Sequence, residues 1–299
     1  MILSIDIGGT AVKMGLVDEG GEVHARHEAS VCFDGYRTPI LTTVMREAEA
    51  FLRRENAQVA GIGVSATGQV DDRAGVVIGT NGKIPGYEGA RIKEEMESRF
   101  HLPVWVLNDA NAAALGECFA GAARGRRHVL MLTLGTGVGG GVYVGGRTVH
   151  GLLHPEVGHM LLRPHPDDPN PRGVCPYHDG CLEGLAAGPA IGARIGGDAR
   201  DLPDDHPTFR LEAHYLAQMC VNLILTVSPQ RIVLGGGVMQ RAALFPMVRA
   251  ETLRLLGRYV QSPAVLEHID EYIVAPALFP VSGLVGSYLI GKRALEERG

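Results

Sequence analysis

The sequence has little of what marks a secreted or membrane-spanning chain. Its five cysteines are an odd number, and no basic segment followed by an apolar one opens the N-terminus, so neither a disulfide framework nor a secretory signal is expected. The longest apolar run, around Met219 to Val227, is too short to cross a bilayer. We therefore expect a cytoplasmic protein without a membrane partner.

Positive charge is also scarce. Lys and Arg number 28 against 33 Asp and Glu, which gives a formal net charge of -5, and the longest basic run is ARGRRH at 123–128. Binding to nucleic acid or to an anionic membrane usually needs a concentrated basic patch, so both partners are disfavoured. A hydrophobic fraction of 45% and 299 residues are typical of a soluble globular protein with room for two domains.

The order of the expected elements is that of an α/β protein. A β-prone run opens the chain and leads through glycine turns into a meander of antiparallel strands. Apolar residues then recur at helical spacing from Ile40 to Leu52, and a buried strand is expected from Val59 to Ser65. Two elements in which a strand ends in a glycine turn, DIGGT and LGTGVGGG, indicate a duplicated architecture. The last third is expected to be mostly helical.

The motif DIGGT could hold a phosphate. Gly8 and Gly9 allow backbone amides to approach an anion closely, while Thr10 and Lys13 can add a hydroxyl and a cation. Asp6, at the end of the strand, could hold Mg²⁺ through water. Taken alone, the motif is more typical of a plain hairpin turn.

Two further glycine clusters follow strands. GTGVGGG at 135–141 has five glycines in seven positions, more than a strand turn requires, and Thr136 could bond a phosphate oxygen. A glycine-rich bulge is the alternative, and the motif matches neither a P-loop nor a dinucleotide fingerprint. In LGGGV at 234–238, a flat nucleoside could lie against bare backbone, although a helix-entry turn fits this segment equally well.

Asp109 follows the predicted strand PVWVL and stands at the start of a predicted helix. An acidic residue in this place most often caps the helix. Between two phosphate-binding glycine loops, it becomes a candidate general base that accepts a proton from an attacking hydroxyl during phosphoryl transfer. Both interpretations remain open at this point.

Cys175, His178 and Cys181 have the spacing C-x2-H-x2-C, so three side chains could converge on a metal ion from one short loop. The spacing is not that of a C-x-x-C redox pair. A tetrahedral zinc site needs a fourth ligand from elsewhere, and with four protein ligands it would be structural, because no position stays open for water. Two unligated cysteines in a loop are the alternative.

In this order, the motifs DIGGT, NDANAAALGE, LGTGVGGG, HPEVGH and CPYHDGCLEG resemble the ROK family of sugar kinases and sugar-responsive repressors, from about Ile2 to Leu289. The resemblance implies an α/β protein with the two-domain actin-like ATPase fold, of ribonuclease H type, in which ATP and sugar meet in the interdomain cleft. It places a small domain at 1–108, with the C-terminal helix 283–299 packing back on it. A larger domain with the zinc-binding loop would span 109–282.

The resemblance also implies a role for each matched residue, with Asp109 as the catalytic base. The implied sugar contacts are Gly68, Asn81, Asn108, Asp109, Glu156, His159 and Glu183. The implied ATP-binding residues are Asp6, Gly8, Gly9, Thr10, Lys13, Gly135, Thr136, Gly137, Gly139, Gly188, Gly235, Gly236 and Gly237. The implied zinc ligands are His159, Cys175, His178 and Cys181, with His154 and His165 as local competitors for the place of His159.

The activity implied is ATP- and Mg²⁺-dependent phosphorylation of a hexose at its 6-hydroxyl, by a homodimer. The segments HPEVGHMLLRPHPDD and CPYHDGCLEGLAAGPAI are most similar to the zinc-containing bacterial fructokinases, which favours D-fructose and fructose 6-phosphate. The start DIGGTAVKMG and the loop GTNGKIPGYEG are more similar to glucose, N-acetylmannosamine or β-glucoside kinases, and LFPVSGLVGS departs from the family pattern xxNAGxxGA. These kinases therefore remain alternatives.

Two other classes of function were weighed against a kinase. Repressor members of the family carry a helix-turn-helix segment ahead of the first phosphate loop, whereas five residues precede Asp6, so DNA binding is not expected. A non-catalytic sugar-sensing regulator would bind sugar without releasing ADP. The presence of Asp109 argues against such a sensor.

Overall fold

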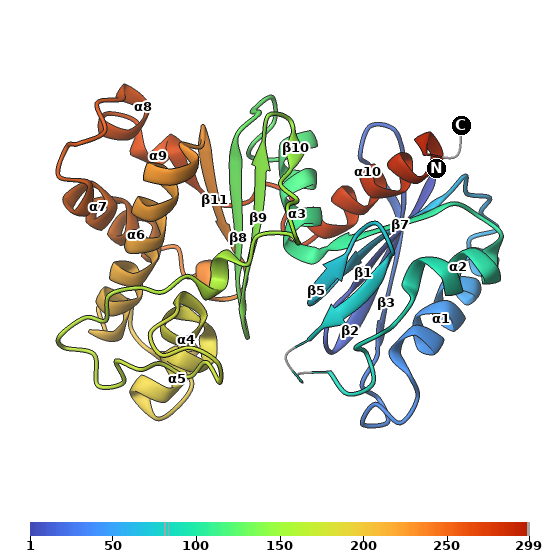
Figure 1. Ribbon diagram of the computed structural model, residues 1–299, viewed down its shortest axis with the longest axis horizontal. Helices are drawn as coiled ribbons and strands as arrows, with labels where there is room; N and C mark the ends of the chain where they lie inside the picture. The colour runs from blue at the N-terminus through green and yellow to red at the C-terminus, as the bar shows by residue number, and fades with distance from the viewer. Residues whose placement is uncertain (81, 83, 298–299) are drawn as a thin grey trace. The chain divides into compact units, whose positions relative to one another are not determined.

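The computed structural model describes residues 1–80, 82 and 84–297, which form two compact units (Figure 1). The first unit comprises Met1–Gly125, Thr148–His154 and Ala277–Gly299, and the second comprises Arg126–Arg147 and Pro155–Pro276. These bounds differ from the expected domains. Helix α3, expected to open the second domain, belongs to the first unit because it packs along the C-terminal helix α10.

A five-stranded sheet forms the centre of the first unit, in the order β3-β2-β1-β4-β7. Strands β1, β2 and β3 pair antiparallel in succession, so the expected antiparallel meander is confirmed. On its other side β1 pairs parallel with β4, and β4 pairs parallel with β7. β1 is almost wholly buried, as its apolar run predicts for a central strand, whereas β3 alternates between half-buried and exposed residues at the edge. The strands are β1 (Ile2–Ile7), β2 (Ala11–Val17), β3 (Val23–Ser30), β4 (Ile62–Ala66) and β7 (Val104–Asn108), and a separate small sheet holds β5 (Gln69–Asp71) and β6 (Val76–Gly79).

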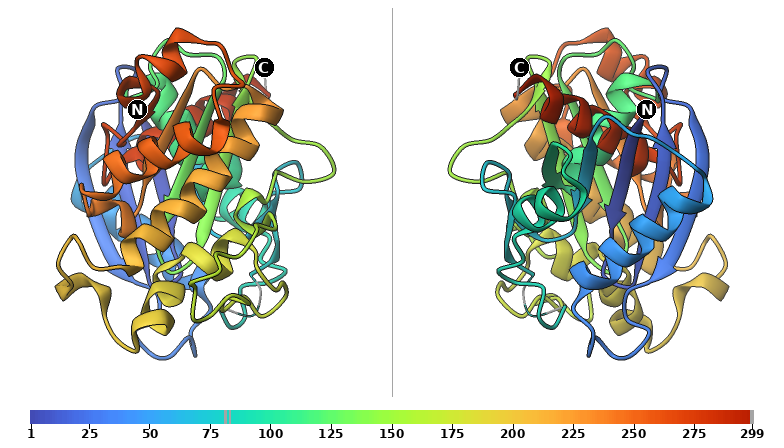
Figure 2. Two further views of the ribbon diagram at one scale, coloured as in Figure 1. Left: turned by 90° about the vertical axis from the view of Figure 1, so that its left-hand side faces the viewer. Right: turned by 90° about the vertical axis from the view of Figure 1, so that its right-hand side faces the viewer.

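Two pairs of helices cover the faces of this sheet (Figures 1 and 2). Helices α1 (Ile40–Arg54) and α2 (Ile92–Phe100) share one hydrophobic core with β1, β2 and β4. Helices α3 (Asp109–Phe119) and α10 (Ser282–Glu296) cover the other face. A Cβ on Gly286 would lie 1.8 Å from the carbonyl oxygen of Ala112, so these two helices approach nearly backbone to backbone.

The sheet of the second unit repeats this topology in the order β10-β9-β8-β11-β12. β8 pairs antiparallel with β9 and parallel with β11, which pairs parallel with β12. The antiparallel and parallel neighbours therefore follow the same sequence as in the first unit, which confirms the duplicated architecture. The strands are β8 (Val129–Leu134), β9 (Val138–Val144), β10 (Arg147–Thr148), β11 (Arg231–Gly235) and β12 (Ile273–Val274).

Helices α6 and α7 lie side by side in the second unit, as the orange helices of Figure 2 show. The helical elements of this unit are η1 (Val157–His159), α4 (Leu182–Ala186), α5 (Gly188–Ile195), η2 (Ala199–Asp201), α6 (Thr208–Val227), η3 (Val238–Gln240), α7 (Leu244–Leu256), α8 (Pro263–Leu266) and α9 (Ile269–Tyr272). The mostly helical last third predicted from the sequence is thus confirmed.

A long irregular segment at 160–181 precedes α4 and is anchored by buried polar contacts. Nε of Arg194 on α5 lies 3.2 Å from Oδ2 of Asp168, and the hydroxyl of Tyr215 on α6 donates to the same oxygen at 2.6 Å. Long segments without regular structure need such anchors to keep one conformation. These bonds fix the middle of the segment that also carries the cysteine pair.

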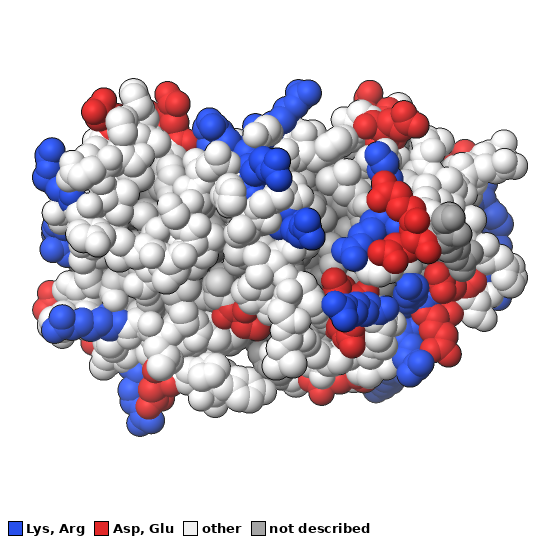
Figure 3. Space-filling view, turned by 45° about the horizontal axis from the view of Figure 1, so that its top comes forward, with Lys and Arg blue, Asp and Glu red and all other residues white. Residues whose placement is uncertain are grey.

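Charges of both signs are mixed on the surface. On the face shown in Figure 3, Lys and Arg side chains lie among Asp and Glu side chains. This distribution agrees with the short basic runs in the sequence. Among the residues that the structure describes, none of the helices is long and apolar enough to cross a membrane.

Candidate functional site

Two partly buried carboxylates, Asp6 and Asp109, stand at the carboxyl ends of parallel strands in the first unit. Asp6 lies near the end of β1, beside Ser65 of β4, whose hydroxyl donates to its Oδ1 at 2.6 Å. Asp109 directly follows β7. Ligands of open α/β sheets bind at this end of the strands, so the topology brings both acids to a suitable place.

Burial changes the acidity of both groups. It raises the pKa of Asp109 to about 6, with a further contribution from the charge of Asp6. Burial also raises the pKa of Asp6, although the hydrogen bond from Ser65 and the charge of Lys13 oppose this increase. An acid with a pKa near 6 is ionised at neutral pH and still basic enough to accept a proton efficiently, so Asp109 has the property that a general base needs.

Helix α3 is capped by Asn108 and not by Asp109. Oδ1 of Asn108 accepts hydrogen bonds from the amides of Ala110 and Asn111 at 3.0 and 3.3 Å. Nδ2 of Asn108 donates to the carbonyl oxygen of Gly68 at 2.9 Å and to Oδ1 of Asp109 at 3.0 Å. The structure thus brings three predicted sugar contacts together, and it gives the capping role to the residue before the proposed base.

The DIGGT motif forms the tight turn between β1 and β2, as its interpretation as a hairpin turn predicts. The amide of Gly8 donates to the carbonyl oxygen of Ala11 at 2.9 Å, and Gly9 and Thr10 lie between them. Lys13 stands on β2 in register with Asp6. The predicted ATP-binding residues Asp6, Gly8, Gly9, Thr10 and Lys13 therefore all lie in this turn or in the two strands that it joins.

In the second unit, the other glycine segments meet at the ends of β8 and β11. Gly135 donates to the carbonyl oxygen of Gly137 at 2.9 Å, and the amide of Gly188 donates to the carbonyl oxygen of Gly135 at 2.8 Å. Gly236 has φ +87°, and a Cβ on it would lie 2.3 Å from the carbonyl oxygen of Leu134. Only glycine fits this contact.

The turn in the GTGVGGG motif is shorter than the motif. Gly135–Gly137 makes the turn, whereas Gly139, Gly140 and Gly141 lie in strand β9, where Gly139 faces Thr133 of β8. Side-chain crowding explains one of these glycines, because a Cβ on Gly140 would lie 1.9 Å from the side chain of Val157. The structure therefore places Gly139 at the beginning of strand β9, directly after the turn.

A pocket of about 1170 Å³ opens beside these turns, and its size suits a nucleotide. Of the predicted ATP-binding residues, Gly135, Thr136, Gly188 and Gly237 line it. The sequence analysis missed the rest of the lining, for which no local motif exists. These residues are Pro189, Ile191, Gly192, Gly197, Asp198, Ala199, Arg200, Asp204, Phe209, Val238, Gln240, Arg241, Ala242 and Ala243.

Arg241 joins two walls of this pocket. Its Nη2 donates to the carbonyl oxygen of Ala199 at 3.0 Å, and its guanidinium pairs with Asp204. The guanidinium carbon lies 4.1 Å from the centroid of the Phe209 ring, within the range of a cation–π contact. The planar group of arginine suits this combination of bonding and stacking.

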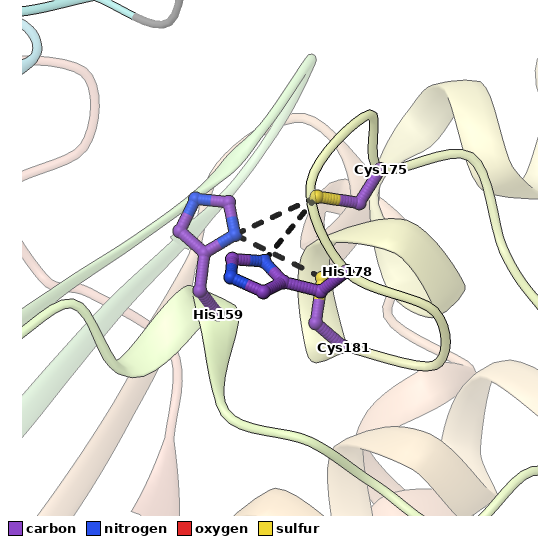
Figure 4. A group of neighbouring side chains, drawn as sticks. All are labelled: His159, Cys175, His178 and Cys181. Carbon is purple, nitrogen blue, oxygen red and sulfur yellow. Dashed lines mark hydrogen bonds between the residues drawn. The ribbon is translucent and has the colours of Figure 1, made fainter.

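The predicted zinc ligands converge as the sequence spacing and the resemblance imply (Figure 4). Nδ1 of His159 lies 3.8 Å from Sγ of both Cys175 and Cys181, and Nδ1 of His178 lies 3.7 Å from Sγ of Cys175. All four candidate ligand atoms lie within 4.8 Å of one another. Ligand atoms of a tetrahedral zinc ion, with bonds of about 2.0 to 2.3 Å, stand roughly 3.5 Å apart, so the cluster fits zinc with little adjustment.

Glu183 connects the loop that carries Cys175 and Cys181 to the glycine turn. Cys181 caps α4, and Glu183 in the first turn of that helix accepts a hydrogen bond from the amide of Val138 at 3.0 Å. Val138 directly follows Gly137, so the segment that carries the cysteines also fixes the end of the proposed phosphate turn. Glu156 is exposed beside η1, where its carbonyl oxygen accepts from the amide of His159.

Two predicted site residues, Asn81 and Gly235, remain to be located. Asn81 lies outside the described residues. Gly235 ends β11, next to Gly236.

The sequence analysis missed Ser65. It could have been found as a polar residue in the apolar strand IGVSA, where a buried hydroxyl needs a hydrogen-bonding partner.

The duplicated sheet, the paired acids and the nucleotide-sized pocket define a protein with the actin-like ATPase fold. The solved structures agree with this assignment. The ROK hexokinase from Thermus thermophilus is 28% identical with a TM-score of 0.79, covering 99% of both chains. A ROK glucokinase from Streptomyces griseus in complex with glucose and AMPPNP is 26% identical with a TM-score of 0.74, covering 98% of this chain and 99% of that chain.

The chain belongs to the ROK family, whose model matches residues 2–293. It is 36% identical over 299 residues to a putative fructokinase of Bacillus subtilis, covering 99% of this chain and 97% of the relative. It is 35% identical over 296 residues to a fructokinase of Pediococcus pentosaceus, covering 98% of both. The family resemblance predicted from the five motifs is thereby confirmed.

Proposed function

We propose that the protein is an ATP-dependent hexose kinase that transfers the γ-phosphoryl group to the 6-hydroxyl, with D-fructose as the favoured acceptor. The observation that carries this proposal is the partly buried Asp109, oriented by Asn108 and with its pKa raised to about 6. A purely structural helix cap has no use for such a group, whereas a base that accepts a hydroxyl proton does.

In the proposed reaction, the O6–H bond of the hexose breaks and its proton passes to a carboxylate oxygen of Asp109. O6 forms a bond to the γ-phosphorus, and the bond from that phosphorus to the bridging oxygen breaks with its electron pair remaining on ADP. Mg²⁺, when bound, supplies positive charge to the phosphate oxygens. Asp6 is the carboxylate placed to hold it through water, since burial and its bond to Ser65 fix its position.

Each unit carries a glycine turn that the proposal assigns to phosphate binding. Amides of the turn at Gly8–Thr10 in the first unit, and of the turn at Gly135–Gly137 in the second, would bond phosphate oxygens. The adenosine would lie in the pocket of the second unit, against Gly237 and the wall that Arg241 holds. Gly139, at the beginning of β9, remains among the proposed ATP-binding residues.

The proposed hexose contacts are Gly68, Asn81, Asn108, Glu156, His159 and Glu183. D-fructose is favoured because the two relatives at 36% and 35% identity are named fructokinases. D-glucose is the second candidate, because a glucokinase of Halalkalibacterium halodurans is 30% identical to this chain over 270 residues. N-acetylmannosamine and β-glucosides are the further alternatives that the sequence motifs raise.

We also propose a structural Zn²⁺ held by His159, Cys175, His178 and Cys181. Four protein ligands would close its coordination, so it would take no direct part in phosphoryl transfer. In Figure 4 the Nδ1 atom of His159 faces the sulfurs, while Nε2 lies on the opposite side of the ring, where it could meet a sugar hydroxyl. Metal and substrate would then share this residue.

An ADP-release assay with ATP and Mg²⁺ over a hexose panel tests the proposal. The panel should hold D-fructose, D-glucose, D-mannose, N-acetylmannosamine and a β-glucoside. We expect the highest kcat/KM with D-fructose and negligible ADP release without sugar. Hexose binding without ADP release from any sugar would instead favour a sensor, and a higher kcat/KM for D-glucose would replace fructokinase by glucokinase.

A further inference from the structure

Tyr36 has an unusual backbone conformation in the loop between β3 and α1. Its φ of 63° lies in the left-handed region, which bulky side chains rarely adopt. Such a conformation is unfavourable and persists only where the surroundings impose it. The loop must therefore gain from holding the Tyr36 side chain in its observed place.

Local hydrogen bonds impose this conformation. Oδ2 of Asp34 accepts from the amide of Thr38 at 2.9 Å and from its hydroxyl at 2.6 Å. Gly35, also left-handed with φ 68°, donates its amide to the carbonyl oxygen of Cys32 at 3.0 Å. Two consecutive left-handed residues reverse the chain, and the ring of Tyr36 packs against the core of the first unit.

The result is a contact between Tyr36 and the first glycine turn. Its hydroxyl donates to the carbonyl oxygen of Gly9 at 2.6 Å. Burial raises the pKa of this hydroxyl, so it remains a proton donor over the whole physiological range of pH. The next carbonyl, that of Thr10, accepts from the amide of Val31 at 3.0 Å.

Because the peptide group is planar, the bond to the Gly9 carbonyl also fixes the direction of the Thr10 amide. The C=O of Gly9 and the N–H of Thr10 belong to one planar trans peptide and point in opposite directions. Since Gly9 can adopt either sign of φ, an unrestrained peptide could flip and turn its carbonyl oxygen toward a bound anion. The bond from Tyr36 opposes that flip, and it keeps the Thr10 amide directed away from the loop.

We propose that Tyr36 is a positioning residue for phosphate binding, whose hydroxyl fixes the Gly9–Thr10 peptide so that the Thr10 amide faces the nucleotide phosphates. This inference rests on the proposed kinase function. It adds a residue that no motif marks, located 26 positions after Thr10 in the chain. Asp34 supports it by holding the turn that presents the Tyr36 side chain.

The substitution Tyr36→Phe tests the proposal because it removes the hydroxyl and keeps the ring. We expect the KM for ATP to rise about three- to ten-fold, the range for one net hydrogen bond, with the hexose KM unchanged. Phe33→Leu is the matched control in the same loop. Phe33 is exposed, with Arg46 5.6 Å from its ring centroid, and its replacement should leave both KM values within two-fold of wild type.

An unchanged KM for ATP in Tyr36→Phe would overturn the proposal, and so would an equal rise in both KM values, which would indicate a general structural effect. Binding of a non-hydrolysable ATP analogue, measured by calorimetry, separates the two levels of inference. If wild type binds the analogue but phosphorylates no hexose, the kinase proposal fails, and a weaker Kd in Tyr36→Phe still supports the positioning role. If wild type binds no nucleotide, both fail.

Discussion

The side-chain amide of Asn108 donates a hydrogen bond to Oδ1 of Asp109 at 3.0 Å, while the other end of the same side chain caps helix α3. The amide of Ala110 donates to the same carboxylate oxygen at 2.8 Å. The beginning of the helix thus fixes the orientation of the carboxylate. Because the group is largely removed from solvent, it keeps a raised pKa despite these donors.

The first prediction concerns this base. Asp109→Asn should lower kcat by about 10²- to 10⁴-fold, the usual contribution of general-base catalysis, and leave hexose affinity largely intact. Steady-state kinetics and hexose titration measure the two effects. Asp167→Asn, at a carboxylate whose side chain is 86% exposed, is the control and should retain full activity. Near wild-type turnover in Asp109→Asn would remove the base assignment.

The second prediction is a pH profile. Since the pKa of Asp109 is raised to about 6 and its ionised form accepts the proton, kcat/KM should fall about ten-fold per pH unit below pH 6. Above pH 7 the base is fully ionised and the profile should be flat with respect to this group. A profile of kcat/KM from pH 5 to 8 that shows no decrease near pH 6 would argue against this role.

The third prediction concerns stability at the same residue. The folded-state pKa of Asp109 lies above its unfolded value of 3.8, so the folded state loses stability as pH rises from about 4 to about 6. At pH 8 the charge on the partly buried carboxylate should cost about 3 kcal/mol. Asp109→Asn should therefore raise Tm by a few degrees at pH 8 and leave it nearly unchanged at pH 3.5. Thermal unfolding at both values checks this, and equal shifts at both would contradict it.

The fourth prediction concerns the metal. Purified protein should contain one zinc per chain, and Cys175→Ser should abolish zinc binding and lower Tm, because three ligands remain and the loop loses its closure. Elemental analysis and thermal unfolding measure these effects. Cys118→Ser, outside the cluster, is the control and should keep its zinc. Wild-type protein prepared without chelators and containing no zinc would refute the site.

The fifth prediction concerns the third glycine cluster. Gly236→Ala should raise the KM for ATP by more than about ten-fold, since its Cβ would collide with the carbonyl oxygen of Leu134 and displace the pocket wall. Gly257→Ala is the matched control, with φ +56° and no atom within 4 Å of the added Cβ. It should cost about 1 kcal/mol of stability and leave the KM for ATP unchanged. Similar KM values in both variants would place the nucleotide elsewhere.

Local patterns in the sequence predict much of this fold. The two strand-turn elements predict the duplicated sheets, because a glycine turn after a buried strand has the same physical cause in both units. The spacing around Cys175 and Cys181 indicates a metal loop, since a loop of this length can bring its own ligands together. In each case, the decisive interactions lie within a few residues of one another.

Contacts between distant segments account for the differences. The bounds of the two units differ from the expected domains because α3 packs on α10 through Gly286, far along the chain. Gly139 was placed in a loop because the side chain of Val157, which requires glycine at Gly140, is not visible in the local pattern. The pocket wall held by Arg241 and the contact of Tyr36 with Gly9 likewise join segments that no motif connects.

The most direct test of the central claim is product analysis after incubation of the wild-type protein with ATP, Mg²⁺ and D-fructose. Phosphorus NMR of the reaction should show fructose 6-phosphate and ADP appearing in equal amounts, and neither product should form when sugar or ATP is left out. Release of ADP and inorganic phosphate without any hexose phosphate, from D-fructose or another hexose, would contradict the assignment as a hexose kinase.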